Sequence, residues 1–480
     1  MSIQTDDRST IPRLRNRYGL LVSSALAAVW TVVFSIRGVL QHLRFHTHAF
    51  DLGIFAQGTW LLSRLKDPFV TVRGLPLFAD HSSYILILIA PIYALVPSPG
   101  TLIVISVVAL GLASVLAYAI AARAGAGSGL SILTGLLVLV APAVQWQVRD
   151  PFHPEVLVIP LILAAVLLLQ HDRHGWAIVV VVVALTAKED VGLVVVPFGL
   201  AVAWLMNKRK VGFVIAGVGL AAFLVNFLVL LPAWSPTGEL LYSYRYGYLG
   251  ESPLGILAGL VTSPDVWWDT VTNPTKVWYV VALVFAMPLA VFASRWLLVG
   301  IPTLAANVLS LHGYQYEIRW HYTAYLVAVV AIAAAFGAAR LRAIGNRGIK
   351  IAAVVASIIV PIGIWVAAAP IRDWAKPHDS NDQMRALLEV VPEGDSVSAW
   401  TSFVPHLTNR EEIYMFPNPF LPYNYGADDT GLPDPSAVEW VVLRWDSFRD
   451  FDHIVEDLID SGDYVVFYED LPFTLLRRAS

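Results

Sequence analysis

The run YGLLVSSALAAVWTVVFSIRGVL, residues 18–40, places this chain in a membrane. It matches the roughly 20 apolar residues that are needed to cross the hydrocarbon core of a bilayer. A basic stretch with Arg8, Arg13, Arg15 and Arg17 comes directly before it. Because the run is too long for the core of a signal peptide and has no obvious cleavage site, we expect a retained first helix with a cytoplasmic N-terminus.

The composition of the whole chain indicates many such spans and two parts. Of the 480 residues 57% are hydrophobic and only 14% charged, with a mean hydropathy of +0.64. The absence of cysteine excludes disulfides, thiol catalysis and cysteine-bound metals. Residues 1–371 hold 24 Lys+Arg and 15 Asp+Glu, whereas residues 372–480 hold 8 and 21. We therefore expect a transmembrane domain over 1–371 and an acidic soluble domain over 372–480, whose charge argues against nucleic acid as a partner.

Eleven apolar segments are candidate transmembrane helices: 18–40, 101–122, 130–146, 155–170, 176–187, 190–206, 211–232, 277–294, 296–311, 322–340 and 351–371. A further stretch, 83–97, is short. The basic loops all fall on the cytoplasmic side only if 83–97 does not cross, so we expect it to lie in or re-enter the outer leaflet. An alternative lets it cross and merges 176–206 into one helix, which would bury Lys188, Glu189 and Asp190 in hydrocarbon. The predicted fold class is an α-helical polytopic membrane protein of about 11 transmembrane helices plus membrane-parallel or re-entrant helices, with a long first outer loop, 41–100.

The acidic part is predicted to be a small extracytoplasmic α/β domain. Its expected elements are a helix at 381–391, strands at 396–400, 439–445 and 464–468, and a helix at 448–461. A Pro- and Asn-rich loop over 417–435 lies between them. Because helices and strands alternate, we expect a partly parallel sheet.

Acids and histidines gather where the apolar segments end, all on the outer side in this topology. Asp51 precedes the amphipathic stretch 54–65, His81 precedes 83–97, and His153 and Glu155 lie in the segment Asp150-Pro151-Phe152-His153-Pro154-Glu155. Ionisable groups near hydrocarbon are costly unless they are paired or solvated, so they mark functional sites more often than packing. The simpler alternatives are helix capping for Asp51 and Glu155 and interfacial hydrogen bonding for His81.

Three further outer segments suit a phosphorylated sugar. Lys188-Glu189-Asp190 lies between two apolar segments, where the lysine could meet a phosphate as a point charge or simply form a solvated turn. Segment 312–322, HGYQYEIRWHY, contains Glu317, Arg319 and His321, and the aromatic-rich loop 233–276 contains Arg245. Aromatic rings and cations suit a sugar ring and a phosphate, and they equally suit the aromatic belt at a membrane interface.

A divalent metal is the cofactor that these groups could hold. His153 and Glu155, with Asp51 or His81, offer the imidazole and carboxylate atoms that Mg, Mn or Zn prefer. The spacing is too generic to identify a metal, and no HExxH, Walker A, GxSxG or EF-hand motif occurs. The cofactor is therefore unknown, with Mg or Mn as the candidates.

Several short segments along the whole chain together resemble the bacterial membrane-protein family of domain of unknown function 2079. They are Phe50-Asp51-Leu52-Gly53-Ile54-Phe55 with Gln57 and Trp60; His81-Ser82; Phe152-His153-Pro154-Glu155; Lys188-Glu189-Asp190; Asn307 to Ser310 with His321-Tyr322; Ser396-Val397-Ser398-Ala399; and Pro405 to Arg410 through Tyr414. That family in turn resembles the GT-C superfamily of membrane glycosyltransferases. The resemblance implies an essential acid in the first outer loop, which Asp51 matches by position, an outer soluble domain and polyprenyl-phosphate sugar donors.

These observations predict a GT-C-like glycosyltransferase of the bacterial inner membrane. It would move a sugar from a polyprenyl-phosphate donor to an extracytoplasmic acceptor, with Asp51 as base or metal anchor. His153 and Glu155 would join it in catalysis, and the candidate substrate-binding residues are His81, Lys188, Glu189, Asp190, Arg245, Glu317, Arg319 and His321. Two rivals remain, a transporter or flippase of lipid-linked sugars and a non-catalytic envelope scaffold. The first would need polar residues across the midplane and internal symmetry, and neither is visible.

Overall fold

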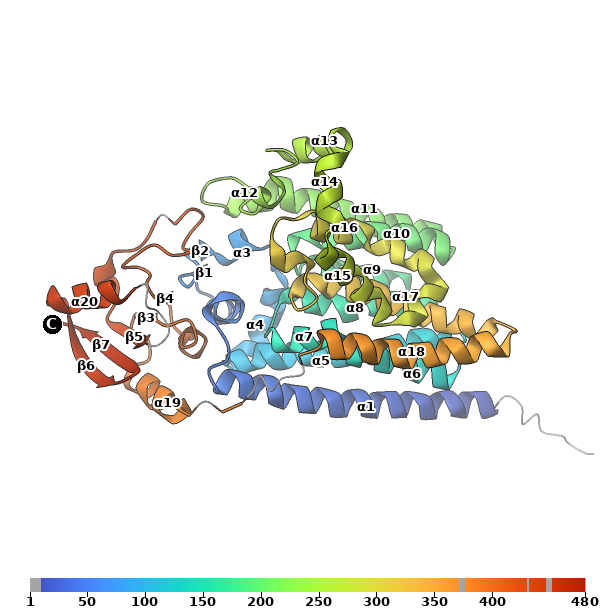
Figure 1. Ribbon diagram of the computed structural model, residues 1–480, viewed down its shortest axis with the longest axis horizontal. Helices are drawn as coiled ribbons and strands as arrows, with labels where there is room; N and C mark the ends of the chain where they lie inside the picture. The colour runs from blue at the N-terminus through green and yellow to red at the C-terminus, as the bar shows by residue number, and fades with distance from the viewer. Residues whose placement is uncertain (1–9, 371–375, 378, 430, 446–450, 480) are drawn as a thin grey trace, which may run out of the picture.

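The computed structural model describes residues 10–370, 376–377, 379–429, 431–445 and 451–479. A body of helices fills most of the molecule, and a small mixed sheet extends from one end of it (Figure 1). Helix α1 (Thr10–Leu43) runs along this body and ends beside the sheet (Figure 1). The boundary predicted between 371 and 372 lies outside the described residues.

The helices of the body follow α1 in chain order. The α-helices are α2 (Ile54–Ser63), α3 (Leu77–Asp80), α4 (Ile85–Leu95), α5 (Pro99–Arg123), α6 (Ser128–Val140), α7 (Pro142–Arg149), α8 (Val158–Gln170), α9 (His174–Leu185), α10 (Gly192–Leu205), α11 (Arg209–Val225), α12 (Leu231–Trp234), α13 (Pro253–Thr262), α14 (Pro264–Val271), α15 (Pro274–Phe285), α16 (Ile301–Leu309), α17 (Ala324–Ala343) and α18 (Arg347–Ala368). Short 3-10 or π segments are η1 (Ala49–Gly53), η2 (Pro154–Leu157), η3 (Glu189–Val191), η4 (Asn226–Leu230), η5 (Ser243–Tyr246), η6 (Pro288–Gly300), η7 (Gly313–Tyr316) and η8 (His321–Thr323), and a two-stranded hairpin joins β1 (Phe69–Val70) to β2 (Leu75–Pro76).

The polytopic helical class is confirmed, but the number of full-length spans is smaller than predicted. By length and composition, six helices of the described chain can cross a membrane, or seven if the bent pair α6 and α7 forms one span. The sequence predicts about 11. Segments 155–170 and 176–187 form shorter apolar helices, and 277–294 is divided at Pro288, where η6 begins. A helix of 12 residues rises only about 18 Å, well short of the hydrocarbon core. The same reasoning applies to 83–97, whose helix α4 has 11 residues.

Small residues let the helices of the body approach closely. Gly337 of α17 lies so close to η6 that a Cβ built there would be 1.8 Å from the carbonyl oxygen of Leu289. Between α10 and α11, a Cβ on Gly199 would lie 2.4 Å from the backbone nitrogen of Ala216. Because lipid offers no hydrophobic force between helices, such close backbone packing is a main source of their association.

The C-terminal sheet is partly parallel, as predicted. Its strand order is β4 (Ile413–Met415), β3 (Val397–Ala399), β5 (Trp440–Arg444), β7 (Phe473–Arg478) and β6 (Tyr464–Asp470). β3 pairs in parallel with β4 and β5, whereas β7 is antiparallel to β5 and β6. Helices α19 (Asn381–Val390) and α20 (Asp452–Asp460) and the short turns η9 (Val404–Leu407) and η10 (Pro435–Ala437) complete this part. Strands β4 and β7 were not predicted.

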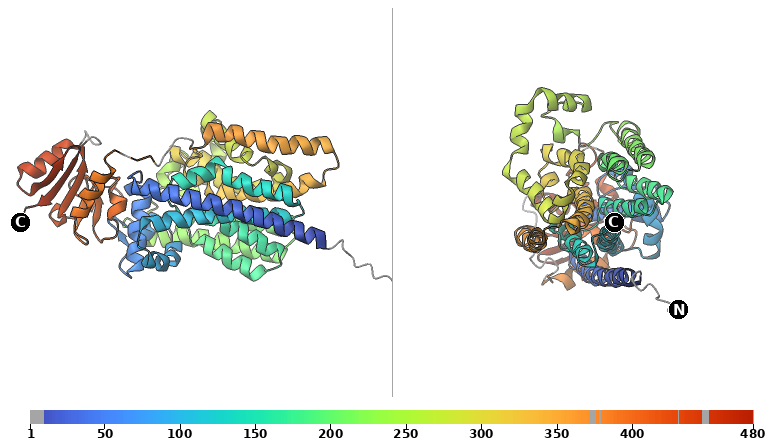
Figure 2. Two further views of the ribbon diagram at one scale, coloured as in Figure 1. Left: turned by 90° about the horizontal axis from the view of Figure 1, so that it is seen from below. Right: turned by 90° about the vertical axis from the view of Figure 1, so that its right-hand side faces the viewer.

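The sheet domain is tied to the first loop of the body. The buried amide of Gln57 donates to the carbonyl of Glu411 at 2.9 Å and to Thr71 Oγ1 at 2.8 Å, and the Thr71 hydroxyl donates to the carbonyl of Ile413 at 2.8 Å. The rings of His42 and His406 stack with centroids 4.1 Å apart. Figure 2 shows the sheet at one end of the helical body and the start of α1 at the opposite end. The loop that carries Asp51 is therefore held by both parts of the protein.

Candidate functional site

Asp51 sits on a strained turn at the sheet end of the body. Its backbone has φ +66° and ψ −88°, a conformation that L-residues rarely adopt. The side chain does not cap α2, which begins three residues later. Instead Oδ1 lies 3.1 Å from Nε2 of His153, and 42% of the side chain remains exposed. The turn thus aims a partly accessible carboxylate at a buried imidazole.

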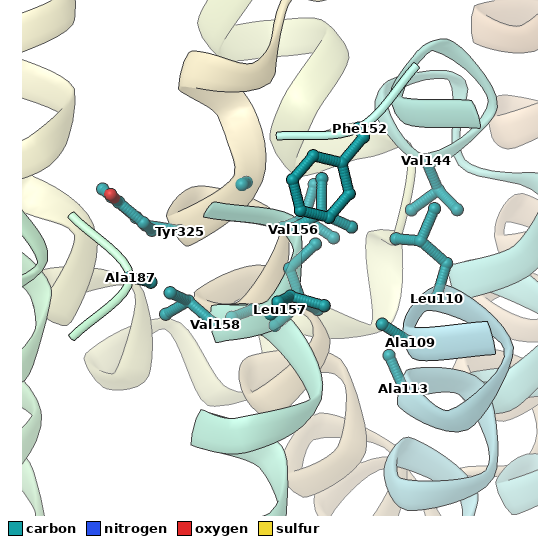
Figure 3. Packing of buried hydrophobic residues seen from close by; sticks show 14 of the residues in the cluster. Ala109, Leu110, Ala113, Val144, Phe152, Val156, Leu157, Val158, Ala187 and Tyr325 are labelled. Carbon is teal, nitrogen blue, oxygen red and sulfur yellow. The ribbon is translucent and has the colours of Figure 1, made fainter. Parts of the chain in front are cut away.

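His153 is the centre of the cluster. It follows Phe152, which also has a positive φ of +55°, and its side chain is only 2% exposed. Nδ1 lies 3.6 Å from Oδ2 of Asp150. Phe152 belongs to the same buried apolar cluster as Val144 and Val156, which underlies this turn (Figure 3). The packed phenyl ring holds the turn that orients the imidazole.

His321, at the start of the span that contains α17, completes the cluster from a distant part of the chain. Its ring stacks on that of His153 with centroids 3.8 Å apart and planes inclined by 18°. Nδ1 lies 3.6 Å from Asp150 Oδ2, and Nε2 lies 3.8 Å from Glu155 Oε1. Two imidazoles and two carboxylates therefore meet in one buried place.

Lys188 and Glu155 form a buried ion pair beside the histidines. Lys188 Nζ donates to Glu155 Oε1 at 2.5 Å, and both side chains are 5% exposed. The ammonium also lies 5.3 Å from the centre of the Tyr322 ring. The lysine predicted to meet a phosphate is thus engaged with a carboxylate, which compensates its charge.

The other two acids near this lysine have their own partners. Glu189 Oε1 lies 2.9 Å from Nδ1 of His81, and its Oε2 accepts the backbone N–H of Ser82 at 3.1 Å. Asp190 accepts the hydroxyl of Tyr325 at 2.7 Å. These contacts join the first loop, the segment after α9 and the start of α17.

The remaining predicted residues lie around this network. Arg245 Nη1 is 3.4 Å from the hydroxyl of Tyr322, its guanidinium lies 4.3 Å from the Tyr242 ring centre, and its buried Nε has no hydrogen-bond partner. Glu317 and Arg319 pair with each other at 3.5 Å on the exposed side, where Arg319 also lies over Trp320. The predicted residues therefore divide into a buried core and a more exposed rim.

The charges in this core shift one another's proton affinities. Burial opposes the charged form of His153, but Asp150 and Asp51 outweigh it and raise its pKa to about 9. Partial burial would raise the pKa of Asp51, yet the charge of His153 and its hydrogen bond lower that pKa to about 2. Burial raises the pKa of Asp150 to about 7 despite the attraction of His153. The core thus favours one positive charge between its carboxylates.

The described residues that could hold a metal differ from the predicted set. Ligand atoms of Asp150, His153 and His321 lie within 4.8 Å of one another. Of the predicted candidates only His153 belongs to this group, because Glu155 is paired with Lys188 and His81 with Glu189. Asp51 contacts the opposite nitrogen of His153.

This chain is similar to known membrane proteins in sequence and in fold. A family model described as "Predicted membrane protein (DUF2079)" matches residues 41–469. The chain belongs to the DUF2079 family. A search of curated protein sequences finds no match to this chain. The match spans both the helical body and the sheet, so membership covers the whole site.

The fold of this DUF2079 protein is similar to that of a solved membrane protein. The crystal structure of ArnT from Cupriavidus metallidurans bound to undecaprenyl phosphate aligns with a TM-score of 0.53 and 12% sequence identity. The alignment covers 95% of this chain and 98% of ArnT. At this identity the likeness establishes a common GT-C-like fold.

Sequence reasoning missed two members of the site. Asp150 was noted only as part of its segment, although it lies three residues before His153 and faces both histidines. Tyr322 touches Arg245 and lies beside Lys188, and it too appears in the sequence analysis only within a segment, His321-Tyr322. Each had a local signal: Asp150 is a carboxylate three residues from a predicted histidine, and Tyr322 directly follows the predicted His321.

Proposed function

We propose that this protein is a membrane glycosyltransferase that moves a sugar from a polyprenyl-phosphate donor to an extracytoplasmic acceptor. The acceptor would be a cell-envelope glycan, lipid or protein, and the site would face outward from a bacterial inner membrane. The observation that carries the proposal is the contact of 3.1 Å between the carboxylate of Asp51, on its strained loop, and the buried His153. The GT-C-like fold, shared with a protein solved with undecaprenyl phosphate, supports the donor class.

In this reaction Asp51 acts as the base. Its carboxylate takes the proton of an acceptor hydroxyl while the hydroxyl oxygen attacks the anomeric carbon of the sugar. The bond between that carbon and the phosphate oxygen breaks, and the polyprenyl phosphate leaves with the electron pair. His153 is held behind Asp51 and orients its carboxylate.

The leaving phosphate needs positive charge. Arg245 is suited to this role, because its buried Nε lacks a partner while the aromatic rings of Tyr242 and Tyr322 hold its guanidinium. Lys188 and Arg319 are less available, since each is paired with a glutamate. Lys188 would act by keeping Glu155 ionised beside His321.

The test compares wild type with Asp51→Asn in liposomes that contain labelled polyprenyl-phosphate sugars and an extract of envelope acceptors. Asp51→Asn keeps the shape of the side chain, and we expect it to lower transfer by at least about 100-fold. Asp67→Asn, an exposed position in the same loop, is the matched control and should retain wild-type rates. Wild-type transfer by Asp51→Asn would refute the assignment. Movement of unchanged donor across the bilayer would indicate a transporter, and no interaction with any donor would favour a scaffold.

A further inference from the structure

We infer that Arg73, Asp80 and Tyr242 are positioning residues through which the sheet domain holds Arg245 in place for the phosphate of the donor. The inference rests on the proposed function, in which Arg245 binds that phosphate. It assigns a role to the sheet domain, which fixes one end of a chain of contacts that ends at the arginine. The members come from the β1–β2 hairpin, the end of α3 and the turn around η5.

Arg73 is bound to the sheet domain at the tip of the β1–β2 hairpin. Its Nη1 donates to the carbonyl of Asn424 at 3.0 Å and to that of Gly426 at 2.5 Å, and its own carbonyl accepts the N–H of Gly426 at 2.8 Å. Gly74, with φ +69°, lets the hairpin pass the buried ring of Tyr425, since a Cβ there would lie 2.4 Å from a ring carbon. Figure 1 shows this hairpin between the sheet and the helices. The sheet domain therefore fixes where the Arg73 side chain lies.

Asp80 connects Arg73 to the outer loop 233–276. Nε of Arg73 lies 3.8 Å from Oδ1 of Asp80, and only 14% and 12% of the two side chains are exposed. The same carboxylate oxygen accepts the hydroxyl of Tyr242. Burial raises the pKa of Tyr242 well above its ordinary value and the charge of Asp80 adds to this, so the hydroxyl stays protonated and donates. Because a hydrogen bond to an ionised acceptor is stronger than one between neutral groups, Asp80 orients the phenol.

Tyr242 and Arg245 lie in one turn of the chain. The backbone N–H of Arg245 donates to the carbonyl of Tyr242 at 3.3 Å, and the guanidinium lies 4.3 Å from the centre of the Tyr242 ring. The face of a tyrosine ring attracts a cation at this distance. The anchored phenol therefore determines where the guanidinium lies, and the buried Nε of Arg245 has no hydrogen-bond partner.

This anchoring matters because a flexible arginine binds an anion less tightly than an ordered one. A side chain that is ordered before binding loses less conformational entropy when the ligand arrives. Without the hydrogen bond to Asp80, the Tyr242 ring and the guanidinium could move together, and the phosphate would have to order both. Contact of the sheet domain with Arg73 and binding of phosphate at Arg245 are thus linked.

The experiment measures binding of undecaprenyl phosphate and of undecaprenol to the full-length protein in detergent. The ratio of the two affinities reports the contribution of the phosphate, because general damage to the fold weakens both lipids alike. Tyr242→Phe keeps the ring and removes the hydroxyl, and we expect it to lower the ratio about 10-fold. Arg73→Met, which acts from further away, should lower it about threefold. The matched control is Tyr248→Phe, which removes the hydrogen bond of another tyrosine in the same loop to the carbonyl of Leu309 and should leave the ratio unchanged.

A double-mutant cycle tests whether the effect reaches the phosphate through Arg245. Arg245→Gln should remove most of the preference for phosphate, and adding Tyr242→Phe to it should lower the ratio by less than about twofold. Asp80→Asn keeps an oxygen that can accept the hydroxyl and should stay within about threefold of wild type, whereas Asp80→Ala should match Tyr242→Phe.

The outcomes separate this inference from the proposed function. An unchanged ratio in Tyr242→Phe, or an equal fall in the wild-type and Arg245→Gln backgrounds, would overturn the inference and leave the proposed function standing. Equal binding of both lipids by the wild type would refute the proposed donor and the inference together. The expected ratios without any sugar transfer would support the inference and refute the transfer reaction alone.

Discussion

The buried pair of Lys188 and Glu155 allows a quantitative test of how this site is held together. Both side chains are 5% exposed and their charged atoms are 2.5 Å apart. Replacing one partner leaves the other charge buried, which costs about 3–5 kcal/mol of unfolding free energy. We expect Glu155→Gln to fall at the lower end of this range.

Lys188→Met should cost more than Glu155→Gln. The core contains the carboxylates of Asp51, Asp150 and Glu155, so loss of the ammonium leaves excess negative charge. The double variant removes both charges together and should therefore lose less than the sum of the two single losses, with a coupling of about 3 kcal/mol.

The assay is the unfolding free energy of the purified protein in mixed micelles for the four members of this cycle. The matched control is the exposed pair of Lys66 and Glu411, for which Glu411→Gln should change stability by less than about 1 kcal/mol. Single variants that lose less than about 1 kcal/mol, or a double variant that equals the sum of both losses, would show that the pair does not stabilise the core.

Two further predictions concern packing and the joint between the two parts. Gly337→Ala should destabilise the helical body by at least about 1–3 kcal/mol in a thermal unfolding experiment, because the new Cβ would meet the carbonyl oxygen of Leu289. The control is Gly217→Ala on an open face of α11, which should be neutral or slightly stabilising in the same experiment. Gln57→Leu should cost about 2–4 kcal/mol, because the carbonyl of Glu411 loses its 2.9 Å hydrogen bond and the N–H of Val72 is left unpaired. Hydrogen exchange should then speed up at Val72 and around Ile413 but not in α17, and unchanged exchange at Val72 would show that the joint does not depend on this amide.

The sequence by itself determined the class of the protein and the location of its polar groups. Long apolar runs must be buried in lipid as helices, and acids near them must be paired, so hydropathy alone indicates a helical body whose polar clusters lie at the helix ends. The separate α/β domain at the C-terminal end was predicted in the same way, since its charge and its alternating helices and strands differ from those of the apolar part. Its helices and three of its strands follow from local periodicity, whereas β4 and β7 depend on pairing with distant strands.

Only the tertiary structure decided which polar groups meet. His153 and His321 stack although many helices separate them in the chain, and Lys188 takes Glu155, 33 residues away, as its partner. Neither pairing has a sequence signature, because the number of residues between two groups does not specify the folded distance. The break before Pro288 and the short lengths of α8 and α9 were likewise missed, since an apolar composition does not report where a helix ends. Among the groups that the loops bring close together, those of opposite charge pair, because little water is present to solvate them separately.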